Sequence, residues 1–315
     1  MSIRRIAKLA NVSTSTVSRV INNHPYVAED KRQRVLKVMK DIDYVPNKNA
    51  INLSSGQSGI IGLVVPYTRN SCYDQLIESI LEEATLHDKK IMLLPTYFDK
   101  NLEKDYYALL RDKTVDGIIV TSKTQDDVFL QELSQFGPVV TTEKTKLPDI
   151  PSVYPDRLKT YHTVFSYLAE LKSFKKIVVS VSRNKQQSYS TELKMTVFSH
   201  YFPEVDVETA FLAGTITYDD GYQLGIRLFN YHKEPLIIYA NGDEVAAGFF
   251  KASQKAGLIM GKDFYLLGED NQLFSELLAI DTVDFHLKEV GKKAVRHLIS
   301  HSKKHEIVSC SLIKR

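Results

Sequence analysis

The chain of 315 residues is poor in cysteine and contains no tryptophan. Its two cysteines, Cys72 and Cys310, are too few for a disulfide framework or a thiolate zinc site. The opening stretch MSIRRIAKLANV lacks the apolar segment that a secretory signal requires. No apolar run in the sequence is long enough to span a bilayer. These absences predict a cytoplasmic protein with no membrane partner.

The sequence motifs of common enzymes are also missing. The patterns GxSxG, HExxH and CxxC do not occur, and the nine histidines show no metal-ligand spacing. The stretch from Gly257 to Lys262 resembles a phosphate-binding loop, but it is one residue short and precedes a predicted strand. We interpret it as a helix end and a turn. Asp284 and His286, two apart on a predicted strand, leave a catalytic pair as an open alternative. We expect no enzyme, no metal site and no cofactor.

Positive charge is concentrated near the N-terminus. Residues 1–58 hold ten Lys and Arg against four Asp and Glu, a net charge of +6, whereas the remaining residues carry −3. A small basic segment on a slightly acidic body favours a polyanion as the partner. The alternative is an ordinary solvated helix with many charges.

Three helical patterns occupy the first 42 residues. Apolar positions predict a helix over Ile3–Ala10, which ends at Asn11, a residue that tolerates the left-handed conformation of a sharp turn. Ser13 is a good N-cap for a second helix that runs to about Asn22. A third helix is expected from about residue 28 to residue 42. Two helices joined by a tight turn and followed by a third are typical of a helix-turn-helix.

The second of these helices has an open face made of small hydroxyl residues and one cation. Its apolar residues can pack on the first helix, which leaves outside the residues Thr14, Ser15, Thr16, Ser18 and Arg19. In a helix-turn-helix the second helix enters the major groove, and residues near its N-terminus reach base edges. Small hydroxyl residues permit a close approach, and an arginine reaches a guanine edge or a phosphate. The pattern therefore predicts binding to double-stranded DNA.

From residue 60 onward, short β-branched runs alternate with helical stretches. The runs are IIGLVVP, KIMLL, VDGIIV, GPVVTT, KKIVVSV, PLIIYA and DFYLLG. Helical patterns fall near 74–87, 102–111 and 127–135 in a first set, and near 157–171, 190–200, 218–231, 243–255 and 287–300 in a second. This alternation predicts two lobes with doubly wound parallel sheets. Ligands bind such sheets at the carboxyl ends of the strands, so a cleft between the lobes is the expected ligand site.

Several segments closely resemble the lactose-repressor/galactose-repressor (LacI/GalR) family of bacterial transcription regulators. They are IAKLANVSTSTVSRVINN and YVPNKNAINL near the N-terminus, and VDGIIV, ANGDEVAAGFFKASQKAGL and LLGEDN in the body. The resemblance implies a small all-α helix-turn-helix head plus an α/β periplasmic-binding-protein-like core of two doubly wound parallel-sheet lobes. It implies a DNA-binding domain over 1–47, a hinge helix and linker over 48–58, and an effector-binding and dimerisation domain over 59–315.

The resemblance also implies roles for residues of the second helix. Thr14 and Ser15 occupy the family's base-reading positions, and Arg19 and Asn22 match its arginine and asparagine on the recognition helix. We place Thr16, from the same open face, with them.

Outside this helix the resemblance implies a hinge helix that orders on operator DNA and inserts Leu53 into the minor groove, with Ala50 one turn before it. The family usually has an acidic residue where this chain has Arg5. Two cations at a helix N-terminus oppose the helix dipole, so we expect Arg4 and Arg5 to meet phosphates.

The resemblance places nine positions around an effector. They are Cys72, Tyr73, Lys194, Thr196, Ile216, Asp243, Asp270, Phe285 and Leu287. Lys194 replaces an arginine that is common in the family, and Ile216 stands where a sugar-stacking aromatic is common. The Asp270 carboxylate can accept hydrogen bonds from two sugar hydroxyls. Core packing is the alternative for Cys72, Tyr73 and Phe285. An ordinary cap or loop aspartate is the alternative for Asp270, and solvent exposure is the alternative for Lys194.

The function that the resemblance implies is that of a homodimeric repressor of carbohydrate-utilisation genes. A sugar or sugar phosphate in the cleft would gate its affinity for operator DNA. The chain stops at LIKR315, where family members without a tetramerisation tail stop, which favours the dimer. Alternatives are a corepressor, an atypical or vestigial pocket controlled by a protein partner, and an enzyme with an accessory DNA-binding head.

Overall fold

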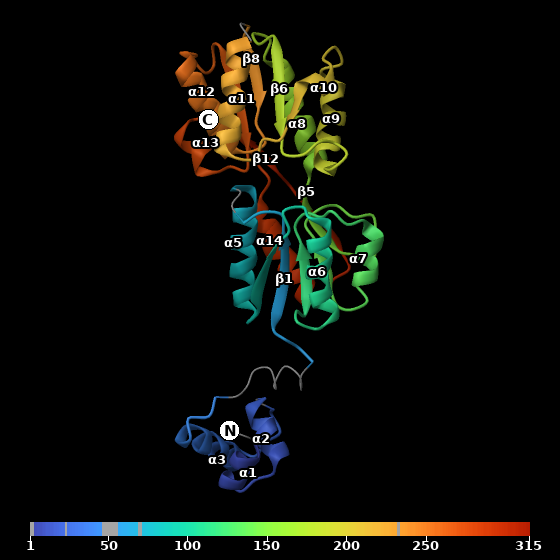
Figure 1. Cartoon of the computed structure of the whole chain (residues 1–315), viewed down its shortest axis with the longest axis vertical. Coiled ribbons are helices and arrows are strands. Elements are labelled where there is room, and N and C mark those ends of the chain that lie inside the picture. Colours follow the sequence, from blue (N-terminus) through green and yellow to red (C-terminus); the bar gives the residue numbers. More distant parts are fainter. Residues whose placement is uncertain (1–2, 23, 46–55, 69–70, 232–233) are drawn as a thin grey trace. The chain divides into compact units, whose positions relative to one another are not determined.

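The computed structural model describes residues 3–22, 24–45, 56–68, 71–231 and 234–315 (Figure 1). The chain divides into two compact units, Met1–Gly59 and Ile60–Arg315. Within the described residues, no helix combines the length and the apolar character that crossing a membrane would require.

The N-terminal unit is a three-helix domain. Its helices are α1 (Ile3–Ala10), α2 (Thr14–Ile21) and α3 (Glu29–Asp41). They enclose a small core made of Ile6, Ala7, Ala10, Val17, Val20 and Val35. Asn11 has a φ of 52°, so the turn between α1 and α2 uses the left-handed conformation that the sequence predicted. The Ser13 side chain caps α2 by accepting the Thr16 N–H at 3.1 Å. The structure confirms the turn and the cap.

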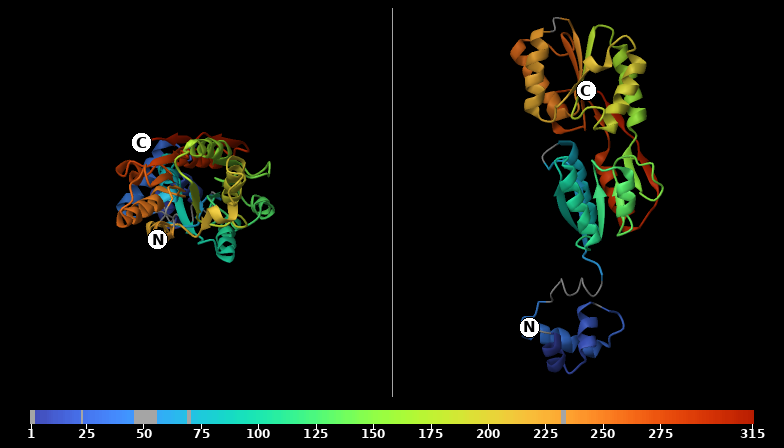
Figure 2. Two further views of the ribbon diagram at one scale, coloured as in Figure 1. Left: turned by 90° about the horizontal axis from the view of Figure 1, so that it is seen from above. Right: turned by 45° about the vertical axis from the view of Figure 1, so that its right-hand side comes forward.

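The second unit contains two lobes, each built on a six-stranded sheet (Figures 1 and 2). In the first lobe the strand order is β11-β5-β4-β3-β1-β2, and all recorded pairs are parallel. The strands are β1 (Ile60–Val65), β2 (Lys90–Pro95), β3 (Gly117–Val120), β4 (Val139–Thr141), β5 (Ser152–Pro155) and β11 (His305–Val308). Its helices are α5 (Ser71–Leu86), α6 (Lys100–Arg111), α7 (Asp127–Leu133) and α14 (Leu287–Ile299).

The second lobe has the strand order β12-β10-β9-β8-β6-β7. Its strands are β6 (Lys176–Val181), β7 (Phe211–Ala213), β8 (Leu236–Tyr239), β9 (Phe264–Glu269), β10 (Asp281–Asp284) and β12 (Ser311–Ile313). Its helices are α8 (Arg157–Glu170), α9 (Tyr189–Tyr201), α10 (Val207–Ala210), α11 (Tyr218–Tyr231), α12 (Asp243–Ala256) and α13 (Leu273–Leu277). The doubly wound, two-lobed architecture is confirmed.

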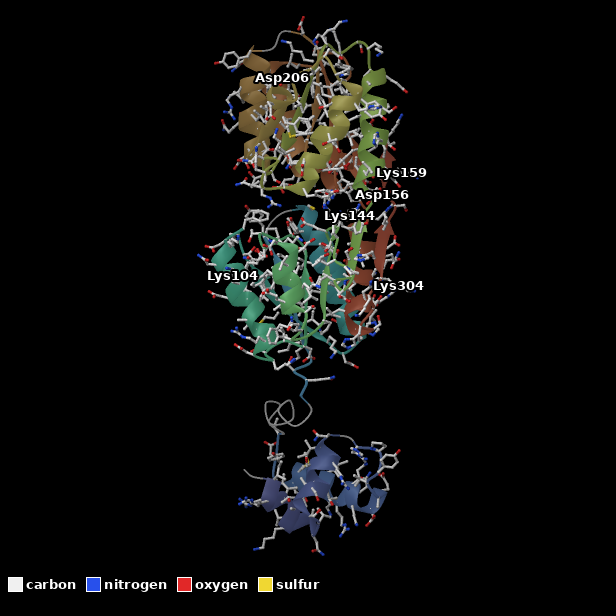
Figure 3. All side chains as sticks on the ribbon, turned by 90° about the vertical axis from the view of Figure 1, so that its right-hand side faces the viewer. Lys104, Lys144, Asp156, Lys159, Asp206 and Lys304 are labelled. Atoms are coloured by element: carbon white, nitrogen blue, oxygen red, sulfur yellow. The ribbon has the colours of Figure 1, made fainter. Side chains whose placement is uncertain are left out.

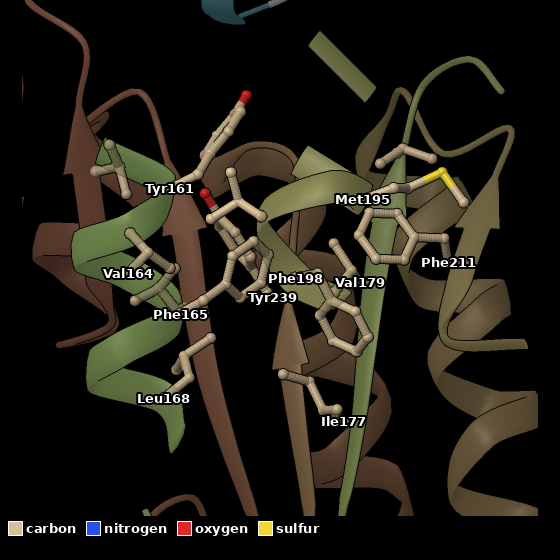
Figure 4. Packing of buried hydrophobic residues seen from close by; sticks show 14 of the residues in the cluster. Tyr161, Val164, Phe165, Leu168, Ile177, Val179, Met195, Phe198, Phe211 and Tyr239 are labelled. Atoms are coloured by element: carbon tan, nitrogen blue, oxygen red, sulfur yellow. The ribbon is translucent and has the colours of Figure 1, made fainter. Parts of the chain in front are cut away.

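Helices cover both faces of each sheet, and each face has its own apolar cluster. In the first lobe, α5 and α14 pack on one face, and α6 and α7 pack on the other. In the second lobe, α11 and α12 cover one face, while α8 and α9 bury an aromatic cluster against the other (Figure 4). There the ring of Phe198 stacks on Phe202 and meets Phe165 edge to face. Sheets covered on both sides explain the nearly continuous apolar strand sequences.

Three features differ from the sequence-based expectations. The helical pattern near 287–300 was predicted with the second lobe, but α14 packs on α5 and on the strands of the first lobe. The expectation of purely parallel sheets is wrong for β12, which pairs antiparallel with β10. The chain passes between the lobes after β5, after β10 and after β11, so sequence order does not assign an element to a lobe.

The structure places two short motifs that the sequence analysis singled out. Gly257 ends α12 in the left-handed conformation, with a φ of 70°, and Gly261 follows with a φ of 83°, so the stretch is a helix end and a turn as predicted. Asp284 is the last residue of β10, and His286 lies beyond it at the N-cap position of α14 with a φ of 49°, so the two do not share a strand face. The His286 Nε2 nevertheless lies 3.8 Å from Asp284 Oδ2, and the His286 N–H donates to Asp284 Oδ1 at 2.7 Å. The His286 Nδ1 lies 2.6 Å from the Ser309 carbonyl oxygen.

Candidate functional site

The first candidate surface is the open face of α2. Thr14, Ser15, Arg19 and Asn22 are all exposed, whereas Thr16 is half-buried. The hydroxyls at the start of the helix bond to one another: Ser13 Oγ lies 2.7 Å from Ser15 Oγ and 2.9 Å from Thr16 Oγ1. This network holds the hydroxyl groups in fixed positions at the helix N-terminus, where an incoming phosphate or base edge would meet them.

Of the other residues predicted to contact DNA, the structure describes Arg4 and Arg5 but not Ala50 and Leu53. Arg4 and Arg5 are exposed in the first turn of α1, which contains no acidic residue. Both guanidinium groups are therefore accessible to a polyanion. Ala50 and Leu53 lie outside the described residues, as does the predicted hinge segment 48–54.

The second candidate site is a cavity of about 290 Å³ between the two lobes. Its lining includes residues that lie one or two positions after strand ends in both sheets, among them Ser122, Arg157, Arg183 and Asp270. The cavity therefore lies at the carboxyl ends of the parallel strands, as the topology predicted. Its volume is near the lower end of the range of about 300–1,000 Å³ that is typical of ligand sites, so it suits a small molecule. Figure 3 labels Lys144 and Asp156, which belong to its lining.

Seven of the nine predicted effector positions line this cavity. They are Cys72, Tyr73, Lys194, Ile216, Asp270, Phe285 and Leu287. Thr196 is not among the lining residues; it is exposed on α9, and its hydroxyl donates to the Glu192 carbonyl at 2.9 Å. Asp243 is fully buried, and its carboxylate accepts the Thr282 hydroxyl at 2.7 Å and the Gln272 N–H at 2.6 Å. The structure does not bring Thr196 or Asp243 into contact with the cavity.

Lys194 forms a buried ion pair at the cavity wall. Its Nζ lies 2.8 Å from Glu269 Oε1, and the two residues are only 3% and 6% exposed. The Tyr239 hydroxyl also donates to Glu269, and the ammonium group lies 4.4 Å from the centre of the Tyr239 ring. The alternative that Lys194 is a solvated surface residue is therefore wrong. Its charge is matched within the protein.

Asp270 lines the cavity in a strained backbone conformation. It has a φ of 85°, which is rare for a residue other than glycine, and it is only 4% exposed. Its carbonyl oxygen accepts a 2.7 Å hydrogen bond from Gln75, on α5 of the opposite lobe. Burial, with a further contribution from the adjacent Glu269 carboxylate, raises the pKa of Asp270 well above its ordinary value. A protonated Asp270 both donates and accepts hydrogen bonds, which suits a hydroxyl-bearing ligand.

Two arginines of the cavity were missed by the sequence analysis. The Arg157 guanidinium lies 4.3 Å from the centre of the Phe285 ring, and that of Arg183 lies 3.8 Å from the centre of the Phe98 ring. The Arg183 side chain crosses from the second lobe to the first, where it also donates to Ser122 Oγ at 3.2 Å. Recognising β5 as a strand would have identified Arg157, because strand ends line such clefts.

The sequence analysis also missed Ser122 and Glu143, which lie just after the ends of β3 and β4. Ser122 follows β3, and its hydroxyl donates to Glu143 Oε1 at 2.9 Å. Burial raises the pKa of Glu143, an effect opposed by the Ser122 hydrogen bond and by the nearby Arg183. The cavity thus combines aromatic rings, two guanidinium groups and protonatable carboxyls.

Comparisons with known proteins agree with this architecture. The family described as "Bacterial regulatory proteins, lacI family" matches residues 2–47. The family described as "Periplasmic binding proteins and sugar binding domain of LacI family" matches residues 58–314. Catabolite control protein B of Bacillus subtilis (strain 168) is 35% identical over 290 residues, which cover 92% of this chain and 91% of that protein. The NTD biosynthesis operon regulator NtdR of the same organism is 30% identical, with 95% and 92% covered.

Solved structures share the fold. A lac repressor dimer bound to operator and the anti-inducer ONPF has a TM-score of 0.84 at 21% identity, covering all of this chain and 98% of that one. The transcriptional regulator CelR in complex with cellobiose has a TM-score of 0.70 at 19% identity, covering all of this chain and 99% of that one. The matching families and the curated relatives show that the chain belongs to the lacI family of bacterial regulatory proteins and is a DNA-binding transcriptional regulator.

Proposed function

We propose that this regulator is a homodimeric repressor of carbohydrate-utilisation genes whose operator affinity is set by a small molecule in the interlobe cavity. The observation that carries the proposal is the pairing of an exposed DNA-reading face on α2 with a ligand-sized cavity at the strand ends. The domains follow as 1–47 for DNA binding, 48–58 for the hinge and linker, and 59–315 for effector binding and dimerisation. The chain acts on DNA in the cytoplasm and catalyses no reaction.

In the proposed complex the two heads of a dimer bind the half-sites of a pseudo-palindromic operator. Thr14, Ser15 and Arg19 read base edges, with Thr16 and Asn22 in support. Arg4 and Arg5 contact phosphates, and their exposure supports this role. In the hinge, Ala50 and Leu53 enter the minor groove.

The cavity couples to DNA through the arrangement of the lobes. Contacts between the lobes, such as the Gln75 bond to the Asp270 carbonyl and the Arg183 contact with Phe98, surround the ligand space. A ligand that binds one lobe arrangement more tightly than another shifts the population between them. A sugar is the proposed ligand class because the CelR structure holds cellobiose and the matching family is described as sugar binding.

The decisive experiment selects operator sequences from random DNA and titrates the complex with sugars and sugar phosphates. We expect a palindromic site whose affinity falls with salt and is lowered by one compound. A compound that tightens binding would establish a corepressor instead. A palindrome indifferent to every compound would refute small-molecule gating and favour control by a protein partner. Failure to select any site would refute sequence-specific binding.

A separate experiment tests the hinge. Leu53→Ala should weaken binding to the selected operator and leave binding to random DNA nearly unchanged, because only the specific complex is expected to kink the DNA. Equal losses on both DNAs would contradict the minor-groove role.

A further inference from the structure

We propose that the ligand of the interlobe cavity is an anion, and that the guanidinium groups of Arg157 and Arg183 bind its phosphate or carboxylate group. This inference rests on the proposed effector role of the cavity and names the chemical class of the effector.

The first observation is that neither of these two cations forms an ion pair within the described residues. Lys194, the buried cation of the wall, is matched by Glu269 at 2.8 Å. In the part of the chain that the structure describes, no carboxylate oxygen lies within 4.0 Å of a guanidinium nitrogen of Arg157 or Arg183. A guanidinium cannot lose its proton at physiological pH, so its positive charge remains in the cavity. Partly buried charges without a partner are costly, and an anionic ligand removes this cost.

The second observation is the way in which both guanidinium groups are held. Each lies over an aromatic ring, at 4.3 Å for Arg157 over Phe285 and 3.8 Å for Arg183 over Phe98. A stacked guanidinium keeps the N–H groups at its edge available for hydrogen bonds in the plane. The ring contacts thus fix the orientation of the donors before a ligand arrives. This arrangement suits the planar, bidentate recognition of a carboxylate or a phosphate.

Arg183 also has an unused donor. Its Nη2 donates to Ser122 Oγ at 3.2 Å, but its Nε is buried and has no hydrogen-bond partner. Buried donors are nearly always paired, so an unpaired N–H at a cavity wall indicates a missing acceptor. A ligand oxygen is the acceptor that the site lacks.

The acidic residues of the cavity do not cancel the two charges. Glu269 accepts from both Lys194 and Tyr239. Asp156 Oδ1 accepts the Lys159 N–H at 3.2 Å and caps α8. Burial raises the pKa values of Asp270 and Glu143, which favours their uncharged forms. The ring contacts and the unpaired Arg183 Nε therefore favour a negatively charged ligand group beside these two arginines.

The test is calorimetric titration of the full-length protein with three matched ligands and two small anions. D-glucose, D-glucose 6-phosphate and D-glucuronate differ at C6, which is a hydroxymethyl group in the first, a phosphorylated hydroxymethyl group in the second and a carboxylate in the third. Inorganic phosphate and acetate report on the anion site without a sugar. We expect saturable binding of one anion class, phosphate or carboxylate, with matched sodium chloride additions correcting for screening. Binding of D-glucose 6-phosphate would indicate a phosphorylated effector, and binding of D-glucuronate would indicate a carboxylate.

Three variants assign the binding to the two arginines. Arg157→Gln and Arg183→Gln should each weaken anion binding by about tenfold or more, because charge-assisted hydrogen bonds are lost. Arg183→Lys keeps the charge but loses the fork, so it should bind with intermediate affinity. Arg227→Gln, at an exposed position on α11, is the matched control and should bind like the parent protein. Thermal unfolding without ligand verifies that each variant folds.

The inference is overturned if no anion binds saturably, or if D-glucose binds as tightly as its charged counterparts. It is also overturned if both glutamine variants retain full anion affinity. Failure of the anion proposal can be distinguished from failure of the proposed small-molecule gating. Release of the operator by a neutral sugar would uphold gating and reject the anion. Anion binding that leaves operator affinity unchanged would uphold the anion and reject gating.

Discussion

Replacing Lys194 with methionine should strongly destabilise the second lobe. The substitution keeps the length of the side chain and its contacts with the rings of Tyr161 and Tyr239, because a thioether packs well on aromatic faces. It removes the ammonium group that lies 2.8 Å from Glu269 Oε1, where the two side chains are only 4% and 8% exposed. The Glu269 carboxylate would then be buried without its ion-pair partner.

The expected cost follows from the burial of the pair. Removing one partner of a buried ion pair typically costs about 3–5 kcal/mol, because the remaining charge stays desolvated. The Tyr239 hydroxyl continues to donate to Glu269, so we expect the lower end of this range, about 3 kcal/mol. For a protein of this size that corresponds to a fall in melting temperature of roughly 6–12 °C. The double variant Lys194→Met/Glu269→Gln removes both charges and should recover about 2 kcal/mol of the loss.

Thermal and urea unfolding, followed by circular dichroism, measure these differences. Lys292→Met is the matched control, because its ion pair with Glu82, at 3.3 Å, has side chains that are 42% and 56% exposed. An exposed pair should contribute less than about 1 kcal/mol. If Lys194→Met lost no more stability than this control, the reasoning from burial would be refuted. A double variant as unstable as Lys194→Met would show that the loss comes from packing and not from charge.

Three further predictions concern helix packing, titration and DNA recognition. An alanine Cβ at Gly248 would lie 2.1 Å from the Tyr218 carbonyl oxygen, so Gly248→Ala should force α11 and α12 apart and cost about 1–3 kcal/mol in urea unfolding. Stability equal to that of Gln223→Ala, an exposed control on α11, would contradict this close approach. Burial raises the pKa of Asp243 to about 6, so the folded chain binds more protons than the unfolded chain between its ordinary pKa of 3.8 and 6. The Asp243 contribution to stability should therefore fall as the pH rises through that interval, by on the order of 3 kcal/mol, and Asp243→Asn should lack this dependence in urea titrations at pH 4 to 7. Arg19→Ala should weaken binding to the selected operator by about 1–3 kcal/mol if the contact is to a base, as measured by fluorescence anisotropy. An equal loss on random DNA would assign the contact to a phosphate, and Arg34→Ala on α3 serves as the control.

The elements that the sequence predicted correctly are those with strong local signals. The three helices of the head follow from apolar spacing, and Asn11 and Ser13 have the turn and cap conformations that their side chains favour. Strands such as β1 are buried runs of β-branched residues and need no tertiary information to be recognised. Edge strands such as β11 and β12 are short and partly exposed, so their sequences carry little pattern.

The cavity was predicted less completely, for geometric reasons. Lys194 and Thr196 are two residues apart on α9, which places their side chains about 200° apart around the helix. Only one of them can therefore face the cavity. Arg157 and Arg183 follow strands, and their roles depend on rings that come from distant segments, Phe285 and Phe98. No local pattern links an arginine to such a ring.

The order in which the chain is synthesised has a consequence for the first lobe. Its sheet begins with β1, but α14 and β11 follow the whole α/β body of the second lobe. During translation, the apolar face that α5 presents to α14 and the edge of β5 that pairs with β11 remain uncovered until residues 287–308 have left the ribosome. Exposed apolar surface and an unpaired strand edge are features that molecular chaperones recognise and that promote aggregation. We therefore expect the second lobe, which lacks only its short edge strand β12 at that stage, to gain protease resistance before the first lobe in stalled nascent chains.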